Sequence, residues 1–165
     1  MKKLVVLLIA IFAVLVSFTS VSAQEANEDF EEFEAFENVG VSVDPFYLHE
    51  VDEGEVPTRG VNPPISEWDV SKKGQYDFRG NAGKSDLYTN YYFVGKTSYR
   101  VEVKNFRSTT LKVELRKRST FGSSLVRSWN VHPKATLISS PRDLDKSGEY
   151  FLRFVAPSEF SGNIR

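Results

Sequence analysis

Two segments near the middle of the chain alternate strictly between apolar and polar residues. Their apolar positions are Tyr99, Val101 and Val103 in the first segment and Leu111, Val113 and Leu115 in the second. Successive side chains of a β-strand point to opposite faces of a sheet, so each segment predicts a strand with one buried face. Because only the short polar stretch 105–108 separates them, the sequence predicts that the two strands pair as an antiparallel hairpin.

Further strand candidates follow one another from residue 65 onward, separated by turns rich in glycine, proline, serine and lysine. The eight candidates are Ile65–Val70, Gln75–Arg79, Leu87–Phe93, Ser98–Lys104, Thr110–Arg116, Leu125–Val131, Ala135–Ser139 and Glu149–Val155. Short strands at regular intervals are typical of a sandwich or a barrel, and no segment is left for a helix. The sequence therefore predicts an all-β domain, a two-sheet antiparallel β-sandwich of the jelly-roll type.

The first 23 residues have the pattern of a signal peptide. Lys2 and Lys3 precede the apolar run Leu4–Val16, and small residues follow it up to Ala23. The run is shorter than the roughly 20 apolar residues of a membrane-spanning helix, and no comparable run follows it. We therefore expect cleavage after Ala23 and release of the chain without a transmembrane anchor, into the extracellular medium or, in a bacterium with two membranes, into the periplasm.

Cysteine is absent from the sequence. This excludes disulfide bonds, thiolate metal sites and catalysis by a cysteine nucleophile. Small secreted domains of eukaryotes usually depend on disulfides, so an exported chain without cysteine favours a bacterial origin.

Charge is divided unevenly along the rest of the chain. Residues 24–56 contain 12 acidic and no basic side chains, whereas residues 57–165 contain 10 acidic and 19 basic ones. Prolines and glycines crowd together over 57–64 and mark a boundary. We expect an acidic tail, linker or propeptide over residues 24–57 and the sandwich domain over 58–165. Phenylalanines spaced by three within 28–39 leave open an amphipathic helix there, with a disordered tail as the alternative.

The segment 147–154 reads Ser-Gly-Glu-Tyr-Phe-Leu-Arg-Phe, in which a glycine and a tyrosine lead into an alternating apolar strand. Together with the central strands 99–103 and 111–115, it resembles bacterial pre-peptidase C-terminal domains, which are secreted jelly-roll modules. The resemblance covers about residues 74–156. It implies a non-catalytic accessory module that helps a secreted protein engage polymers or stay soluble.

One segment has the beginning of a calcium-binding loop. Asp143, Asp145 and Ser147 place oxygen atoms at alternate positions before Gly148. The twelfth position of such a loop should be a glutamate, but Phe154 occupies it. The segment is therefore either a calcium site or a polar turn that leads into the last strand, and no other cofactor is expected.

Basic residues at outward positions of neighbouring strands predict a binding face. The candidates are Lys112, Arg116, Arg100 and Lys104, with Tyr91 and Tyr92 as rings on which a sugar could stack. The expected partner is an anionic polymer or a glycan of the cell envelope, and nucleic acid is not expected. Two alternatives are open: Glu102 and Glu114 neutralise these cations in cross-strand ion pairs, and the tyrosines pack in the core.

No set of residues suited to catalysis is recognisable. The two histidines, His49 and His132, lie far apart in turn-like segments, and no nucleophile motif is present. We therefore expect a secreted, non-catalytic binding or structural module that engages envelope polymers or glycans. A first alternative is a basic domain, shielded by the acidic tail or propeptide, that acts on anionic envelopes as antimicrobial proteins do. A hydrolase is the second alternative.

Overall fold

The computed structural model describes residues 37–45, 63–120 and 122–165, all of which belong to one compact unit, 35–165. The predicted signal peptide and most of the predicted acidic segment lie outside the described residues. In the described part of the chain, no helix is long and apolar enough to cross a membrane.

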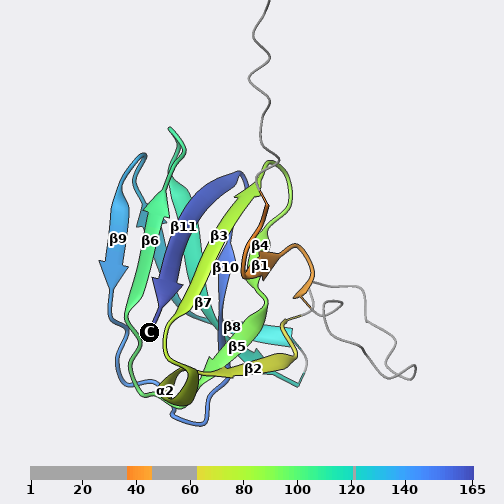
Figure 1. Cartoon of the computed structure of the whole chain (residues 1–165), viewed down its shortest axis with the longest axis vertical. Helices are drawn as coiled ribbons and strands as arrows, with labels where there is room; N and C mark the ends of the chain where they lie inside the picture. Colours follow the sequence, from red (N-terminus) through yellow and green to blue (C-terminus); the bar gives the residue numbers. More distant parts are fainter. Residues whose placement is uncertain (1–36, 46–62, 121) are drawn as a thin grey trace, which may run out of the picture. The chain divides into compact units, whose positions relative to one another are not determined.

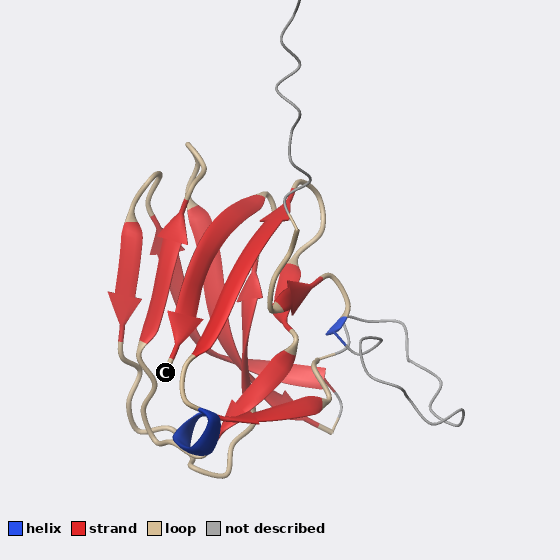
Figure 2. Ribbon diagram, in the orientation of Figure 1, coloured by secondary structure: helices blue, strands red, loops and turns tan. Residues whose placement is uncertain are grey.

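The described residues form a two-sheet β-sandwich, which confirms the predicted fold class (Figures 1 and 2). The four-stranded sheet has the order β3 (Tyr76–Ala82), β11 (Ser158–Ile164), β6 (Val101–Asn105) and β9 (Thr136–Ser139). The seven-stranded sheet contains β1 (Val41–Ser42), β2 (Ser66–Asp69), β4 (Leu87–Thr89), β5 (Tyr91–Val94), β7 (Leu111–Ser119), β8 (Gly122–Val131) and β10 (Tyr150–Phe154). Each predicted segment therefore overlaps a strand, and the segment 87–93 contains β4 and most of β5.

Strand β10 lies at the centre of the seven-stranded sheet. It pairs with β7 along one edge and with both β4 and β5 along the other, so β4 and β5 together act as one interrupted strand. Beyond β7 lies β8, which pairs with no other strand of the described chain. Strands β8 and β9 are therefore edge strands of the two sheets.

The predicted central hairpin is wrong. Strand β6 lies between β11 and β9 in the four-stranded sheet, whereas β7 lies between β10 and β8 in the seven-stranded sheet. Both strands do bury their apolar faces, but they approach the core from opposite sides. Alternation identifies the buried face of a strand without identifying its neighbour, and the connection 106–110 crosses from one sheet to the other.

Three elements were not expected from the sequence. Strand β11, next to the centre of its sheet, follows Pro157 and contains Gly162, both of which weaken a strand pattern. The two residues of β1 fall in the segment interpreted as a linker, yet Val41 is buried and pairs with Thr89. The helix α2 (Val70–Lys73) begins at Asp69, whose side chain accepts a hydrogen bond from the backbone nitrogen of Ser71 at 2.9 Å.

Aromatic rings fill much of the space between the sheets. Phe154 of β10 stacks on Phe160 of β11 with 3.7 Å between the ring centroids, and Phe78 of β3 contacts both rings. All three side chains are buried. Because rings from both sheets meet in one cluster, the two sheets are held together by a single continuous core.

Candidate functional site

The predicted basic residues do not form one face. Lys104 is exposed on β6, with Arg100 just before that strand, so both belong to the outer side of the four-stranded sheet. The side chains of Lys112 and Arg116 project from the outer face of the seven-stranded sheet, because Val113 and Leu115 of the same strand point into the core. The two pairs therefore lie on opposite sides of the sandwich.

Lys112 and Arg116 both pair with an internal carboxylate. Glu114 is only 3 % exposed and accepts bonds from Lys112 Nζ at 2.8 Å and from Arg116 Nη1 at 2.7 Å. A third cation, Arg153, lies 3.2 Å from the same carboxylate. Burial opposes ionisation of Glu114, but the hydrogen bonds from Lys112 and Arg116 outweigh it, and the pKa of Glu114 is lowered. This is the ion-pair alternative that the sequence left open for Glu114.

The two tyrosine candidates point in opposite directions, as neighbours on a strand must. Tyr91 packs edge-on against Trp68 and Tyr76, with ring centroids 5.6 and 5.7 Å away. Tyr92 leaves the other face of β5, where the guanidinium of Arg118 lies 4.9 Å from its ring centroid. The two rings therefore cannot form one stacking platform.

The candidate calcium residues are divided between two environments. Asp145 Oδ1 accepts bonds from the backbone nitrogen of Ser147 at 2.9 Å and from its hydroxyl at 2.7 Å, while Oδ2 pairs with Lys117 at 3.0 Å. Asp143 takes part in none of these bonds and has a positive φ of 60°. Among the described residues, no group of three acidic, histidine or cysteine side chains comes together to hold a metal. The calcium site stays a prediction.

The turn at Asp145 is expected to make stability sensitive to acid. Hydrogen bonds from Ser147 and Lys117 lower the pKa of Asp145 from 3.8 to about 2. A carboxyl with a lowered pKa in the folded state stabilises the fold above its unfolded pKa, and this contribution is lost as the pH falls toward the folded value. Asp145→Asn should therefore lower the melting temperature at pH 5, and the gap to the wild type should narrow between pH 4 and pH 2. A difference in melting temperature between the two proteins that stays constant from pH 5 to pH 2 would contradict the stabilising role of the ionised Asp145.

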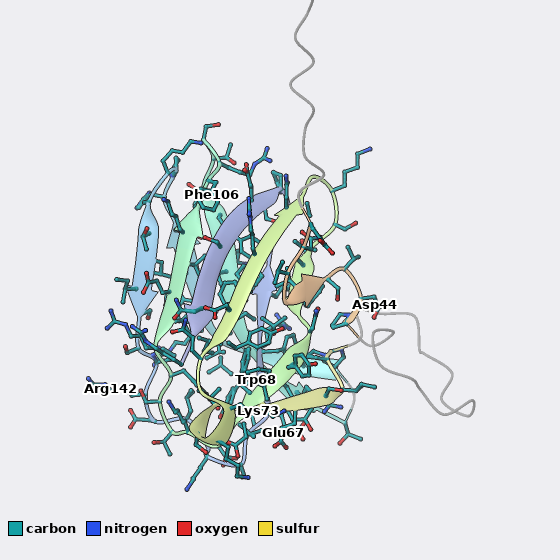
Figure 3. The ribbon with its side chains drawn as sticks, in the orientation of Figure 1. Asp44, Glu67, Trp68, Lys73, Phe106 and Arg142 are labelled. Carbon is teal, nitrogen blue, oxygen red and sulfur yellow. The ribbon has the colours of Figure 1, made fainter. Side chains whose placement is uncertain are left out.

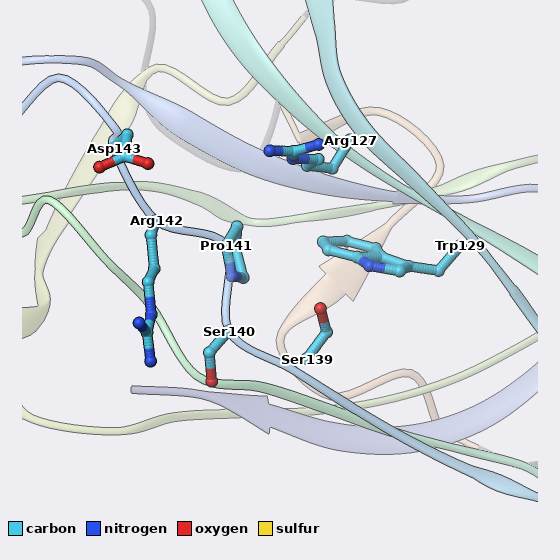
Figure 4. A pocket seen from close by; sticks show the side chains of 7 residues that line it. All are labelled: Arg127, Trp129, Ser139, Ser140, Pro141, Arg142 and Asp143. Atoms are coloured by element: carbon cyan, nitrogen blue, oxygen red, sulfur yellow. The ribbon is translucent and has the colours of Figure 1, made fainter.

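A cleft opens where the edges of the two sheets face each other. We call it the edge cleft. It has a volume of about 320 Å³ and is lined by Arg127, Trp129, Ser139, Ser140, Pro141, Arg142 and Asp143. Arg127 and Trp129 come from β8, Ser139 ends β9, and the other residues belong to the connection between β9 and β10. Figure 4 shows Arg127 and Trp129 reaching from β8 toward the loop that carries Pro141.

The register of β8 explains why these side chains reach the cleft. Trp129 pairs with Val113 and Arg127 pairs with Leu115, so both side chains leave β8 on its core-facing side. The indole of Trp129 packs against the core with part of its surface and lines the cleft with the rest. Arg127 lies two residues before Trp129 on the same side of the strand, and its exposed side chain also lines the cleft.

The polar groups of the edge cleft are free for a ligand. Within the described part of the chain, the side chains of Arg127, Arg142 and Asp143 form no hydrogen bond or ion pair. The lining therefore offers guanidinium donors, a carboxylate acceptor and two serine hydroxyls beside one half-buried indole. Such a mixture of donors, acceptors and an aromatic surface suits a small ligand that carries several hydroxyl groups.

The edge cleft was not predicted from the sequence. Trp129 lies in the predicted strand Leu125–Val131 but is not among the candidate binding residues, and Asp143 is a candidate only as a calcium ligand. A signal was present: Arg127 occupies a position that alternates in phase with the core residues Trp129 and Val131. A cation at a core-facing position indicates that the strand lies at an edge open to water.

No protein-family model matches the chain, and no curated protein matches it. The match to the crystal structure of PirA covers 55 % of this chain and 89 % of the PirA chain, with 13 % sequence identity and a TM-score of 0.38. The match to a family 6 carbohydrate-binding module covers 53 % of this chain and 70 % of that module's chain, with 11 % sequence identity and a TM-score of 0.36. A family 43 arabinoxylan arabinofuranohydrolase from Bacillus subtilis covers 56 % of this chain and 21 % of that enzyme, with 15 % identity and a TM-score of 0.35. At these TM-scores the likeness carries no argument about function.

Proposed function

We propose that this protein is an exported, non-catalytic module that binds a glycan of the cell envelope in the edge cleft. The observation that carries the proposal is the half-buried Trp129 beside polar groups that have no partner in the described chain. The signal-peptide pattern of residues 1–23 supports export of the chain, which would bring it into contact with envelope glycans.

The indole of Trp129 would provide the surface on which a sugar ring stacks. Its packing against the core fixes its position, so little side-chain entropy is lost when the ligand binds. Arg127 can donate to ring hydroxyls, and Asp143 can accept from them. A volume of about 320 Å³ lies at the lower end of the range for ligand pockets, which suits one or two sugar units of a longer polymer.

The composition of the edge cleft favours binding over catalysis. Hydrolysis of a glycosidic bond usually requires two carboxyl groups on either side of the scissile bond. Asp143 is the one carboxyl group among the residues that line the edge cleft. The β-sandwich implied by the resemblance to pre-peptidase C-terminal domains is observed, and an accessory role like that of those domains is part of the proposal.

The proposal predicts that glycan binding depends on Trp129. Trp129→Ala removes the stacking surface and should weaken binding at least about thirtyfold, the loss typical of a central aromatic contact. The measurement is affinity electrophoresis of the full chain through a panel of envelope polysaccharides, both neutral and anionic. Arg127→Gln should weaken binding of the retained polymer without abolishing it, because stacking remains.

Trp68→Ala is the matched control. Trp68 is also half-buried and packs on Tyr76, and its indole nitrogen donates to the carbonyl oxygen of Gly74 at 3.1 Å. It lies beside Lys73 of α2, away from Arg142 of the edge cleft (Figure 3). Its replacement should cost stability but preserve binding. Equal loss of binding in the two variants, or normal binding by Trp129→Ala, would contradict the proposal.

A further inference from the structure

A second pocket lies on the outer face of the seven-stranded sheet. We call it the outer-face pocket. It has a volume of about 220 Å³ and is lined by Tyr88, Arg116, Ser123, Phe151 and Arg153. The strand register brings these residues together, because Arg153 pairs with Tyr88 on β4 and Phe151 pairs with Arg116 on β7. The rings of Tyr88 and Phe151, whose centroids are 6.4 Å apart, form its apolar part.

The polar groups that line the outer-face pocket are all capable of donating hydrogen bonds. Two are guanidiniums, one is the phenol of Tyr88 and one is the hydroxyl of Ser123. Burial raises the pKa of Tyr88, so the phenol keeps its proton and remains a donor at neutral pH. No carboxylate is among the lining residues, in contrast to the edge cleft, where Asp143 is present.

Two carboxylates that are not among the lining residues, Asp86 and Glu114, hold the two arginines of the pocket. Asp86 Oδ2 accepts from Arg153 Nε at 2.9 Å and from Nη2 at 2.5 Å, and Glu114 accepts from Nη1 at 3.2 Å. Arg116 donates to Glu114 at 2.7 Å and, through Nε, to the hydroxyl of Ser123 at 2.9 Å. Each guanidinium carries five N–H groups, so these contacts orient it without using all of its donors.

The local charge also favours an anion. Three cations, Lys112, Arg116 and Arg153, share two carboxylates, Glu114 and Asp86. The cluster therefore has one positive charge in excess, and its two guanidiniums are partly buried, with side chains 20 and 30 % exposed. A rigid pair of arginines with spare donors is well suited to the oxygen atoms of a phosphate or a carboxylate.

We propose that the outer-face pocket binds a compact oxyanion, the phosphate or carboxylate group of an anionic polymer, between Arg116 and Arg153. Its oxygens accept hydrogen bonds from the two guanidiniums, with the hydroxyls of Tyr88 and Ser123 as further donors. The pocket shares no lining residue with the edge cleft, so a ligand in one site does not occupy the other. Two sites on one polymer would add to its affinity through effective concentration.

The test is a titration of the full chain with sodium phosphate and, separately, with sodium glucuronate, at ionic strength held constant with sodium chloride. Two-dimensional amide NMR gives both the affinity and the location. We expect saturable shifts at Arg116, Ser123, Phe151 and Arg153, with a dissociation constant on the order of 1 mM for a single oxyanion. Saturation by phosphate alone would identify a phosphate-bearing polymer, and saturation by glucuronate alone an acidic glycan. Shifts no larger than those with chloride, or shifts confined to other residues, would overturn the proposal.

Variants separate this pocket from general attraction by basic side chains. Arg153→Gln should weaken oxyanion binding about tenfold, as expected for the loss of a charged donor pair. Lys104→Gln, which removes an equal charge from the other sheet, should change it less than about twofold. Ser123→Ala, which preserves every charge, provides the same test if Arg153→Gln does not fold, and should weaken binding about threefold. Binding that is unchanged in the pocket variants, or lost equally in Lys104→Gln, would overturn the proposal.

Discussion

Replacing Gly162 by alanine is expected to destabilise the protein by about 3 kcal/mol or more, the upper range for forcing an extra group into a packed core. Gly162 lies in the middle of β11, between β3 and β6. A Cβ atom there would be only 2.0 Å from the carbonyl oxygen of Glu102 and 2.8 Å from Cε2 of Phe78. The first neighbour belongs to the backbone of β6, so the contact can be relieved only by separating two paired strands.

Urea unfolding followed by tryptophan fluorescence measures this effect. The matched control is Gly83→Ala, because no atom lies within 4 Å of the Cβ that it would introduce. Against a total stability of about 5–15 kcal/mol for a domain, Gly162→Ala should shift the midpoint strongly or prevent folding, while Gly83→Ala should behave like the wild type. A normal midpoint for Gly162→Ala would show that β11 is not paired with β6 as described.

Replacing Asn105 by alanine is expected to cost about 3 kcal/mol, because several backbone groups lose their partners at once. Asn105 is buried at the end of β6, where the chain leaves one sheet for the other. Its side-chain nitrogen donates to the carbonyl oxygens of Thr109, Val131 and His132 at 2.8, 3.1 and 3.2 Å. Its side-chain oxygen accepts from the backbone nitrogen of Arg107 at 2.9 Å.

These bonds join the β6–β7 connection to the end of β8, so Asn105 supports the crossover between the sheets. Asn105→Asp retains the acceptor for Arg107 but loses every donor, and should therefore be nearly as unstable as Asn105→Ala. Asn130→Ala, an exposed asparagine on β8, is the control and should change the free energy of unfolding by less than about 0.5 kcal/mol. Equal stability of all three variants would contradict this role.

The fold class was predictable because alternation along a strand depends on the environment of its two faces. Val101, Val103, Val113 and Leu115 are all buried, as the alternation required. The pairing was not predictable, since β6 and β7 would present the same pattern in one sheet or in two. Strand β11 was missed because Gly162 occupies one of its core-facing positions, between Phe160 and Ile164, and interrupts the apolar pattern at the place where the backbones of β11 and β6 approach closely.

The candidate site was harder to predict from the sequence than the fold class. Lys112 and Arg116 looked like unpaired cations, but Glu114 lies between them on the same face of the strand and pairs with both, and also with Arg153 from β10. Only the remaining N–H donors of Arg116 are left for a ligand. The edge cleft brings the end of β8 together with the β9–β10 connection, and its shape depends on which strands form the edges of the two sheets. That information lies in the sheet order, which local periodicity does not contain.

The most direct test of the central claim, that this protein binds a glycan in the edge cleft, is to locate the binding site by amide NMR. The full chain would be titrated with an oligosaccharide released from the polymer that affinity electrophoresis shows to be retained most strongly. The account predicts saturable shifts at the backbone of Arg127 and Trp129, at the Trp129 indole N–H and at residues 139–143 other than proline. Shifts that cluster elsewhere, for instance at Trp68 and its neighbours in β2 and β5, would contradict it.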